Sequence, residues 1–284
     1  MPLLDRFHRF VLTAGLLAGG ICTLALVTAS ESRAQGMHLV AHRAIYDLSL
    51  ARSQKMSLEA VRGRILYDFG GNSCDGYTLQ VRQVSELDNG EGKLNLSDLR
   101  STTWEDGAGK SFRFASHNYV NQKLAVTVDG HAERQADGIQ VVLKMPVAKT
   151  FHLSPNTVFP TEQIRRVLDA AHAGKKVLEL PVYDGSENGE KLYSTLSVIG
   201  DKIAPDRKPD DAAADKSALT GMARWPVTVS YFEQSGKGEQ TPVYTISFEL
   251  YDNGISRALS LDYNDFVIAG KMNTLDIHAA KPCR

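Results

Sequence analysis

The sequence predicts a mainly β protein, in which an antiparallel sheet packs around one amphipathic helix. Two observations predict this class. Apolar and polar residues alternate with a period of two in one segment after another, as in strands with one buried and one solvated face. Asp or Asn followed by glycine separates many of these segments, and these residues tolerate the positive φ of hairpin turns. Such pairs occur at Asn89-Gly90, Asp129-Gly130, Asp137-Gly138, Asn188-Gly189 and Asn253-Gly254.

The alternation is clearest in residues 61–69 and 243–250, which are rich in β-branched and aromatic side chains. Such side chains are typical of strands because they fit a pleated, half-buried surface. The same pattern predicts strands in residues 39–52, 60–70, 76–87, 93–105, 110–118, 123–133, 138–145, 148–153, 176–184, 190–201, 224–235, 241–252, 255–263 and 264–278.

One segment, "FPTEQIRRVLDAAHAGKK", has helical spacing instead. Its apolar residues recur every three or four positions, which places them on one face of a helix from Glu162 to Ala173. Thr161 is suited to the N-cap, and Gly174 followed by two lysines is typical of a helix end. The apolar face consists of Ile164, Val167, Leu168 and Ala171.

The first 34 residues have the layout of a secretory signal peptide. Basic residues between Arg6 and Arg9 precede the uncharged apolar stretch Phe10–Val27, and small residues ending at Ala29 or Ala34 offer cleavage sites. We therefore expect residues 1–34 to be removed and residues 35–284 to form one secreted domain without an integral membrane span. The alternative is an uncleaved anchor, because about 18 apolar residues are marginally enough to cross a bilayer.

The chain contains three cysteines, and Cys22 lies in the predicted signal peptide. A secreted protein with two remaining cysteines most often joins them, so we expect a structural disulfide between Cys74 and Cys283. A metal site would need further Cys or His ligands at short spacing, and a redox catalyst would need Cys-x-x-Cys. Neither pattern surrounds these two cysteines.

The charge balance argues against nucleic acid as a partner. Removal of residues 1–34 takes three arginines, Asp5 and Glu31 from the 32 basic and 33 acidic residues, which leaves 29 basic and 31 acidic ones. A chain with this slight acidic surplus has no excess of cations with which to bind a phosphate backbone.

No residue pattern predicts a catalytic, cofactor or metal site. His42 and Asp47 are the strongest candidates for a catalytic pair, but they are five positions apart along a strand, which places them on opposite faces. We therefore expect His42 to make structural hydrogen bonds. The stretch "DGSENGE" from Asp184 resembles a calcium loop, yet its twelfth position is Thr195, where a bidentate Glu is needed. A hairpin loop is expected there, and no enzymatic turnover is predicted for the chain.

Two further expectations concern less patterned features. Residues 204–217 are rich in Asp, Ala and Pro, and their apolar residues show neither the period of a strand nor that of a helix. This predicts an exposed or disordered loop. Trp104 and Trp225 are expected to lie in the core rather than to serve as ligand platforms.

Several short motifs follow one another along the chain, namely "HRAIYDLSL", "GRILYDFGGNSCDGY", "TTWEDGAGKSFRF", "FPTEQIRR", "LPVYDGSENGEKLY" and the C-terminal Cys. In this order they resemble the envelope integrity protein B (EipB) family of alphaproteobacterial periplasmic proteins. The resemblance implies a β-spiral, which is an incomplete barrel of antiparallel strands around a central helix. It also implies a disulfide between Cys74 and Cys283, a periplasmic location and a non-enzymatic role in maintaining the cell envelope.

One position departs from the family pattern. The resemblance leads us to expect a His soon after "FPT", and Glu162 and Gln163 stand there. A role assigned to that His is therefore not carried over to this chain.

Two classes of function remain open from the sequence, with an unrecognised hydrolase as a minor third. The first is an interaction protein that contacts other periplasmic proteins through its sheet edges and the acidic loop near Asp210; the resemblance makes a helical-repeat protein a plausible partner. The second is a carrier of lipid or another amphiphile on the concave sheet face. Space beside the helix discriminates them, because an apolar pocket of about 300 Å³ or more would favour the carrier.

Overall fold

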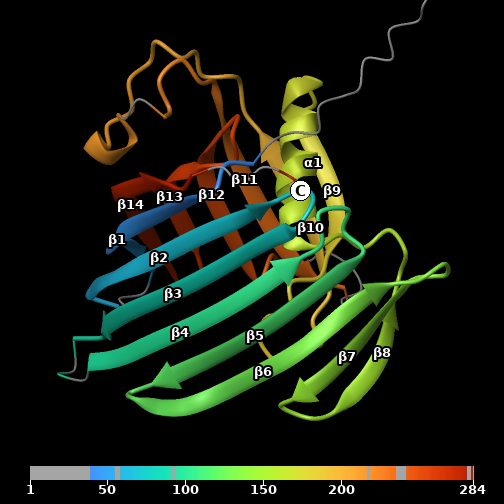
Figure 1. Ribbon diagram of the computed structural model, residues 1–284. Helices are drawn as coiled ribbons and strands as arrows, with labels where there is room; N and C mark the ends of the chain where they lie inside the picture. Colours follow the sequence, from blue (N-terminus) through green and yellow to red (C-terminus); the bar gives the residue numbers. More distant parts are fainter. Residues whose placement is uncertain are drawn as a thin grey trace, which may run out of the picture. The chain divides into compact units, whose positions relative to one another are not determined.

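Antiparallel strands form one continuous 14-stranded sheet that curls around a helix (Figure 1). The computed structural model describes residues 39–54, 58–90, 92, 94–215, 218–234, 241–279 and 283. The described residues belong to one compact unit, Gly36–Arg284. The predicted signal peptide and its cleavage sites lie outside the described residues.

Each predicted strand has a counterpart in the structure, with bounds that differ by a few residues at most. The first eight strands are β1 His42–Ser53, β2 Ala60–Asn72, β3 Gly76–Asp88, β4 Leu94–Glu105, β5 Ser111–Val120, β6 Lys123–Arg134, β7 Ile139–Met145 and β8 Lys149–Leu153. The other six, which follow the helix, are β9 Val177–Val182, β10 Tyr193–Ile199, β11 Arg224–Glu233, β12 Tyr244–Tyr251, β13 Ser256–Asp262 and β14 Phe266–Ile277. The predicted turn at Asp129-Gly130 is wrong, because this pair lies inside β6, where the register with β7 shifts.

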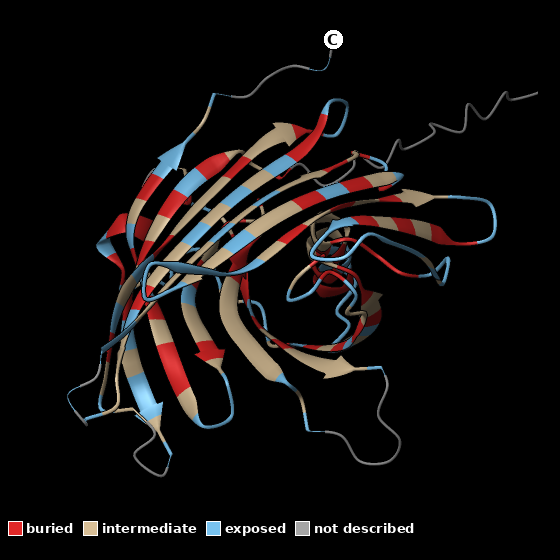
Figure 2. Ribbon diagram, turned by 90° about the horizontal axis from the view of Figure 1, so that it is seen from below, coloured by how far each residue is buried: buried red, intermediate tan, exposed pale blue. Residues whose placement is uncertain are grey.

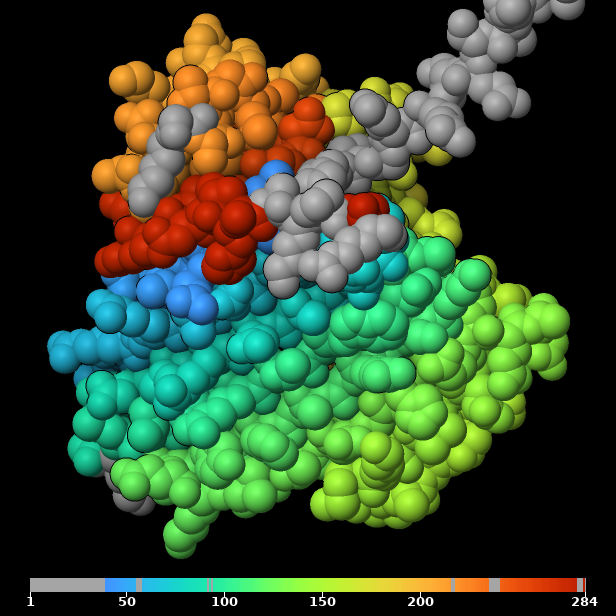
Figure 3. Space-filling model, viewed as in Figure 1, coloured from blue at the N-terminus to red at the C-terminus, as the bar shows by residue number. Residues whose placement is uncertain are grey.

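The sheet consists of two meanders that meet at the first and last strands. Its order is β8-β7-β6-β5-β4-β3-β2-β1-β14-β13-β12-β11-β10-β9. β1 pairs with β14 in a register that places His42 opposite Ile277. Figure 3 shows the junction on one face, where the red band of β14 lies beside the blue band of β1. The edge strands β8 and β9 are not hydrogen-bonded to each other, so the sheet is an incomplete barrel.

Burial alternates along the strands, as the period-two pattern predicts (Figure 2). In β10, for example, Tyr193 and Thr195 are buried while Ser194 and Val198 are exposed. Side chains of the inner face form the core, because successive Cβ atoms of a strand point to opposite faces.

The helix α1 spans Pro160–His172, close to the predicted range. Its N-cap is Phe159 rather than Thr161, so the predicted cap residue is wrong. The buried side chains of Val167 and Leu168 pack in a cluster with Phe69 of β2 and Trp225 of β11. The helix therefore bridges the two meanders through apolar contacts.

The segment before β11 is packed only in its second half, which corrects part of the prediction for residues 204–217. Residues 204–208 and Asp210 are exposed, as predicted, whereas Asp211, Ala213 and Ala214 are buried. It contains a short 3₁₀ helix, η1, at Ala212–Ala214, and Ala213 and Ala214 are buried against β14. Asp211 is 2% exposed and accepts a hydrogen bond of 3.0 Å from Arg257 Nε. Residues 216 and 217 lie outside the described part of the chain.

Arg257 of β13 is the centre of an ion cluster that holds this segment. Its guanidinium is 3% exposed and also binds Glu249 at 2.5 Å and the carboxylate of Asp210. Arg224 donates to the same Glu249. Each buried charge of this cluster therefore has a partner of opposite sign, as burial requires.

No helix in the described part of the chain has both the length and the apolar character that a membrane crossing requires.

Candidate functional site

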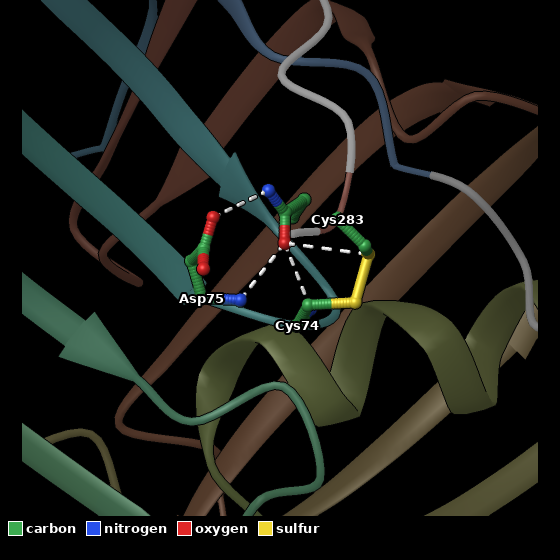
Figure 4. The surroundings of a disulfide bond; sticks show 4 residues. Cys74, Asp75 and Cys283 are labelled. Carbon is green, nitrogen blue, oxygen red and sulfur yellow. Dashed lines mark hydrogen bonds between the residues drawn. A yellow bond between two sulfur atoms is a disulfide. The ribbon is translucent and has the colours of Figure 1, made fainter.

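The end of the chain is joined to the turn between β2 and β3 (Figure 4). Cys74 in this turn and Cys283 form a disulfide, with their Cα atoms 5.6 Å apart. The structure thus contains the bond expected from the cysteine count. It links positions separated by 209 residues in the sequence.

Asn72 organises the turn that carries Cys74. Its side chain is buried, and Oδ1 accepts the backbone N–H groups of Cys74 and Asp75, each at 2.8 Å. Its Nδ2 donates to the Asp75 carboxylate at 2.9 Å (Figure 4). The sulfur of Cys283 lies 3.9 Å from Oδ1. A disulfide sulfur carries no proton, so that contact is one of packing.

A glycine allows the hairpin to close around this turn. Gly71 has φ +94°, which disfavours residues with a side chain. A Cβ there would lie 2.1 Å from the carbonyl oxygen of Gly76 on the facing strand. The motif "GGNSCDGY" therefore combines a close backbone approach at Gly71 with the side-chain turn of Asn72 and the cysteine.

Glu105 at the end of β4 caps α1 from a distance. Its Oε2 accepts the N–H of Thr161 at 2.7 Å and its Oε1 accepts the N–H of Glu162 at 2.9 Å. The carboxyl is 2% exposed, and burial, opposed by these hydrogen bonds, raises its pKa to about 7. Because Phe159 makes no side-chain cap, Glu105 satisfies N–H groups that a helix start leaves free.

Gln163 occupies the region where the family resemblance leads us to expect a His. The side chain is buried and its Nε2 lies 3.4 Å from Thr195 Oγ1 on β10. Thr195 in turn donates to the carbonyl of Leu180 on β9 at 2.9 Å. This chain of contacts ties the helix to the second meander.

The helix covers one part of the concave face. Val167 and Leu168 are buried, but Ile164 is only partly buried. Apolar side chains of the inner face remain partly exposed along several strands, namely Val81, Leu99, Ile246, Phe248 and Leu259.

A hollow of about 300 Å³ lies at the C-terminal end of the helix. Its lining includes Lys175, Lys202 and Trp225. Because lysine side chains line it, this hollow is not the apolar pocket that would favour a carrier.

His42 and Asp47 are not brought together, as the strand geometry predicts. The Nδ1 atom of His42 lies 2.7 Å from the carbonyl oxygen of Val40, and its ring stacks on Tyr67 with centroids 5.5 Å apart. Burial is the main reason that the pKa of His42 is lowered. Asp47 instead accepts a hydrogen bond of 2.7 Å from Arg64. His42 therefore makes the structural contacts expected of it.

The loop from Asp184 closes on itself. Asp184 Oδ1 accepts the N–H of Ser186 at 2.9 Å, and the Tyr183 hydroxyl donates to the Gly189 carbonyl at 2.6 Å. Among the described residues, no group of three or more His, Cys, Asp or Glu is placed to hold a metal ion.

Both tryptophans are expected in the core, but only one of them lies there. Trp225 is 4% exposed and belongs to the core, whereas Trp104 is half-buried and lines a hollow on the other face of the sheet. The core prediction is therefore wrong for Trp104. Because side chains alternate along β4, Trp104 faces away from the core when the next residue, Glu105, is buried inside.

The hollow beside Trp104 has a volume of about 570 Å³. It lies over β3 to β7. The residues that line it are Thr78, Thr102, Thr103, Trp104, Arg113, Phe114, Ala115, Asp129, Gly130, His131, Glu133 and Lys144.

Known proteins are similar to this chain over most of its length. The EipB-like family model matches residues 33–279. The cell envelope integrity protein EipB of Brucella abortus (strain 2308) is 36% identical over 272 residues, which cover 95% of this chain and 96% of the relative. A crystal structure of a beta-barrel-like protein of DUF1849 from Brucella abortus has a TM-score of 0.79 and 36% identity, and covers 86% of this chain and 100% of that one. The resemblance and fold class inferred from the sequence are confirmed, and the chain belongs to the EipB-like family.

Proposed function

We propose that this chain is a periplasmic protein that supports cell-envelope integrity through non-enzymatic contacts with other envelope proteins. The observation that carries the proposal is the 36% identity, over nearly the full length of both chains, to a protein named for cell envelope integrity. The disulfide of Cys74 and Cys283 is consistent with an oxidising compartment such as the periplasm.

The contacts of three histidines support a role without catalysis. His42 is bound to a backbone carbonyl, His172 lies 2.6 Å from Asp252, and His278 lies 2.9 Å from Asp68. The contact of His42 is local, and those of His172 and His278 join segments that are far apart in the chain. All three therefore have a structural role to fill. Screening of esterase, phosphatase and peptidase substrates should detect no turnover. A hydrolytic rate that His42→Gln abolished without unfolding the protein would contradict a non-enzymatic role.

The sheet offers a contact surface where β6 extends beyond β7. β7 pairs with β6 only from Asp129 onward, so residues 123–128 have β5 as their neighbour on one side. Leu124 is 56% exposed and Val126 is 38% exposed. Such an edge can pair with an extended strand of another protein, in which main-chain hydrogen bonds give affinity and side-chain contacts give specificity.

The acidic loop near Asp210 is a weaker candidate for a contact surface than the edge of β6, although the side chain of Asp210 remains exposed. Asp210 and Asp211 both bind Arg257, and Asp211 is buried. Their carboxylates are thus engaged within the chain. The edge of β6 is therefore the stronger candidate for partner contact.

Gene deletion in the source bacterium tests the proposal. Deletion should increase sensitivity to detergents, and the wild-type gene should restore resistance. A Leu124→Lys, Val126→Lys double variant should restore it poorly, because the charges oppose apolar contact. Val198→Lys is the matched control, since Val198 is 48% exposed on β10. Full resistance in the deletion strain would overturn the envelope role, and full rescue by the double variant would overturn the β6 surface alone.

A photo-crosslinking residue at position 124 identifies the partner directly. We expect it to capture a periplasmic protein, for which a helical-repeat protein is our candidate, while the same residue at position 198 should not. Capture of the same proteins from both positions would argue against a specific contact at β6.

The partly exposed apolar residues of the concave face favour a second candidate, a binder of lipid or another amphiphile. Val81, Leu99 and Ile246 lie on strands of both meanders and remain partly accessible. Native mass spectrometry of protein purified gently from its own envelope should then show bound lipid. Protein that carries partner but no lipid would leave the interaction role as the better account.

A further inference from the structure

A row of polar and aromatic side chains crosses four strands on the outer face of the sheet. Thr78 of β3 lies opposite Trp104 of β4, Trp104 opposite Arg113 of β5, and Arg113 opposite His131 of β6. Side chains at directly opposite positions have Cβ atoms about 4.5–5.5 Å apart. The register therefore places an indole, a guanidinium and an imidazole beside one another.

A small residue next to this row creates the hollow. In the neighbouring row, Ala115 stands between Thr102 and Asp129. Its methyl group is short compared with the side chains on either side. The resulting volume of about 570 Å³ falls within the range of about 300–1,000 Å³ typical of small-molecule sites.

The charged groups of the hollow differ in how far they are already paired. The two carboxylates are engaged, because Asp129 lies 3.4 Å from Lys144 Nζ and Glu133 accepts a hydrogen bond from Ser111. Arg113 stands over the Trp104 ring at 5.2 Å from its centroid. Within the described residues, no carboxylate forms an ion pair with Arg113, and no hydrogen bond is formed by the ring of His131.

We propose that this hollow binds a small molecule through a carboxylate or phosphate group, which Arg113 and His131 hold beside Trp104. The guanidinium presents two parallel N–H donors that match the oxygens of either group. The imidazole ring of His131 adds an N–H donor. The hydroxyl groups of Thr78 and Thr102 are further donors in the lining. This site is independent of the proposed contact surface on β6.

Tryptophan fluorescence provides the test, because the chain has two tryptophans and Trp225→Phe leaves Trp104 as the reporter. Inorganic phosphate and acetate are the two probes, each compared with sodium chloride at equal ionic strength. We expect a saturable change in Trp104 emission with at least one probe. The probe with the lower midpoint distinguishes the phosphate source from the carboxylate source.

Arg113→Gln should raise the midpoint at least fivefold, whereas Arg62→Gln should leave it unchanged. Arg62 is an exposed arginine of β2 that does not line the hollow, which makes it the matched control. Affinity is read from the midpoint, since removal of Arg113 also alters the emission of Trp104 itself. A response that is linear with both probes, or one that both variants weaken equally, would overturn the site.

The wild-type protein gives the same information if Trp225→Phe does not fold. In ¹⁵N-labelled protein, the two indole N–H signals are assigned by the loss of one signal in Trp104→Phe. The Trp104 signal should shift with the probe to saturation, while the signal of buried Trp225 stays in place. Equal shifts of the two signals would contradict the proposal.

Discussion

Glu105 and Thr161 are separated by 56 residues, yet the carboxylate of Glu105 accepts the backbone N–H of Thr161 at 2.7 Å. The neighbouring N–H of Glu162 binds the second carboxylate oxygen at 2.9 Å. A strand residue thus performs the task of a helix cap. The contact also fixes the start of α1 against the end of β4, so helix and sheet are positioned together.

Glu105→Gln should lower the free energy of unfolding by about 1–3 kcal/mol, because the amide can accept with only one of its two terminal atoms and leaves a buried donor unsatisfied. Urea denaturation followed by circular dichroism measures this. Glu179→Gln is the control, since Glu179 is exposed on β9. An unchanged midpoint for Glu105→Gln would show that the cap contributes little.

The pH dependence of this difference follows from burial, which raises the pKa of Glu105 to about 7. A group with a raised pKa in the folded state contributes stability at low pH, and that contribution is lost as pH rises through about 7. The deficit of Glu105→Gln should therefore be larger at pH 5 than at pH 8. A deficit that grows with pH would mean that the helix N–H groups favour the carboxylate more than burial opposes it.

Loss of the disulfide should destabilise the protein by several kcal/mol. The chain-entropy estimate for a loop of this length is roughly 5 kcal/mol and is an upper figure. Cys74→Ser, Cys283→Ser and the double variant should have the same stability, because all three lose one bond. Thiol titration of denatured, unreduced protein from the periplasm should find no free thiol. Two free thiols per chain would contradict formation of the bond there.

Arg257→Met should cost about 3–5 kcal/mol, because it leaves the buried Asp211 without its cation. The first structural effect should be release of the segment that contains η1. Limited proteolysis should then cut within residues 211–215 in the variant and spare them in the wild type. Arg207→Met is a control on the same segment, since its exposed side chain makes no such cluster.

Leu168→Ala should cost about 2–5 kcal/mol, since Leu168 is fully buried and its loss leaves a cavity. Asp169→Ala changes the next, exposed residue of the same helix and should have an effect within about 0.5 kcal/mol. Thermal or chemical denaturation of both variants compares core packing with helix propensity. Similar losses in the two would show that α1 contributes little to the core.

The strands and the helix could be predicted because their signals are local. Alternation, turn residues and the spacing of Val167 and Leu168 all lie within a few positions of one another. The disulfide could be predicted for a different reason, since the two cysteines outside the predicted signal peptide allow only one pairing within the chain.

What sequence analysis missed depends on residues far apart in the chain. Glu105 caps a helix that begins after β8, and Arg257 binds a segment that precedes β11. No local pattern reveals such partners. Trp104 is different, because counting alternate positions from the buried end of β4 would have placed it on the outer face.

The pairing of β1 with β14 also sets an order of events during synthesis. Strands β1 to β8 can pair with their sequence neighbours early, because contacts between residues close in the sequence form fastest. The free edge of β1 must wait until nearly the whole chain has been made, because the partner of His42 is Ile277. Contacts between such distant residues slow folding, and an open edge can pair with another chain in the meantime. The strand order of the sheet therefore leaves β1 accessible to chaperones until β14 pairs with it. A delay in the release of the C-terminus should increase aggregation through this edge with time.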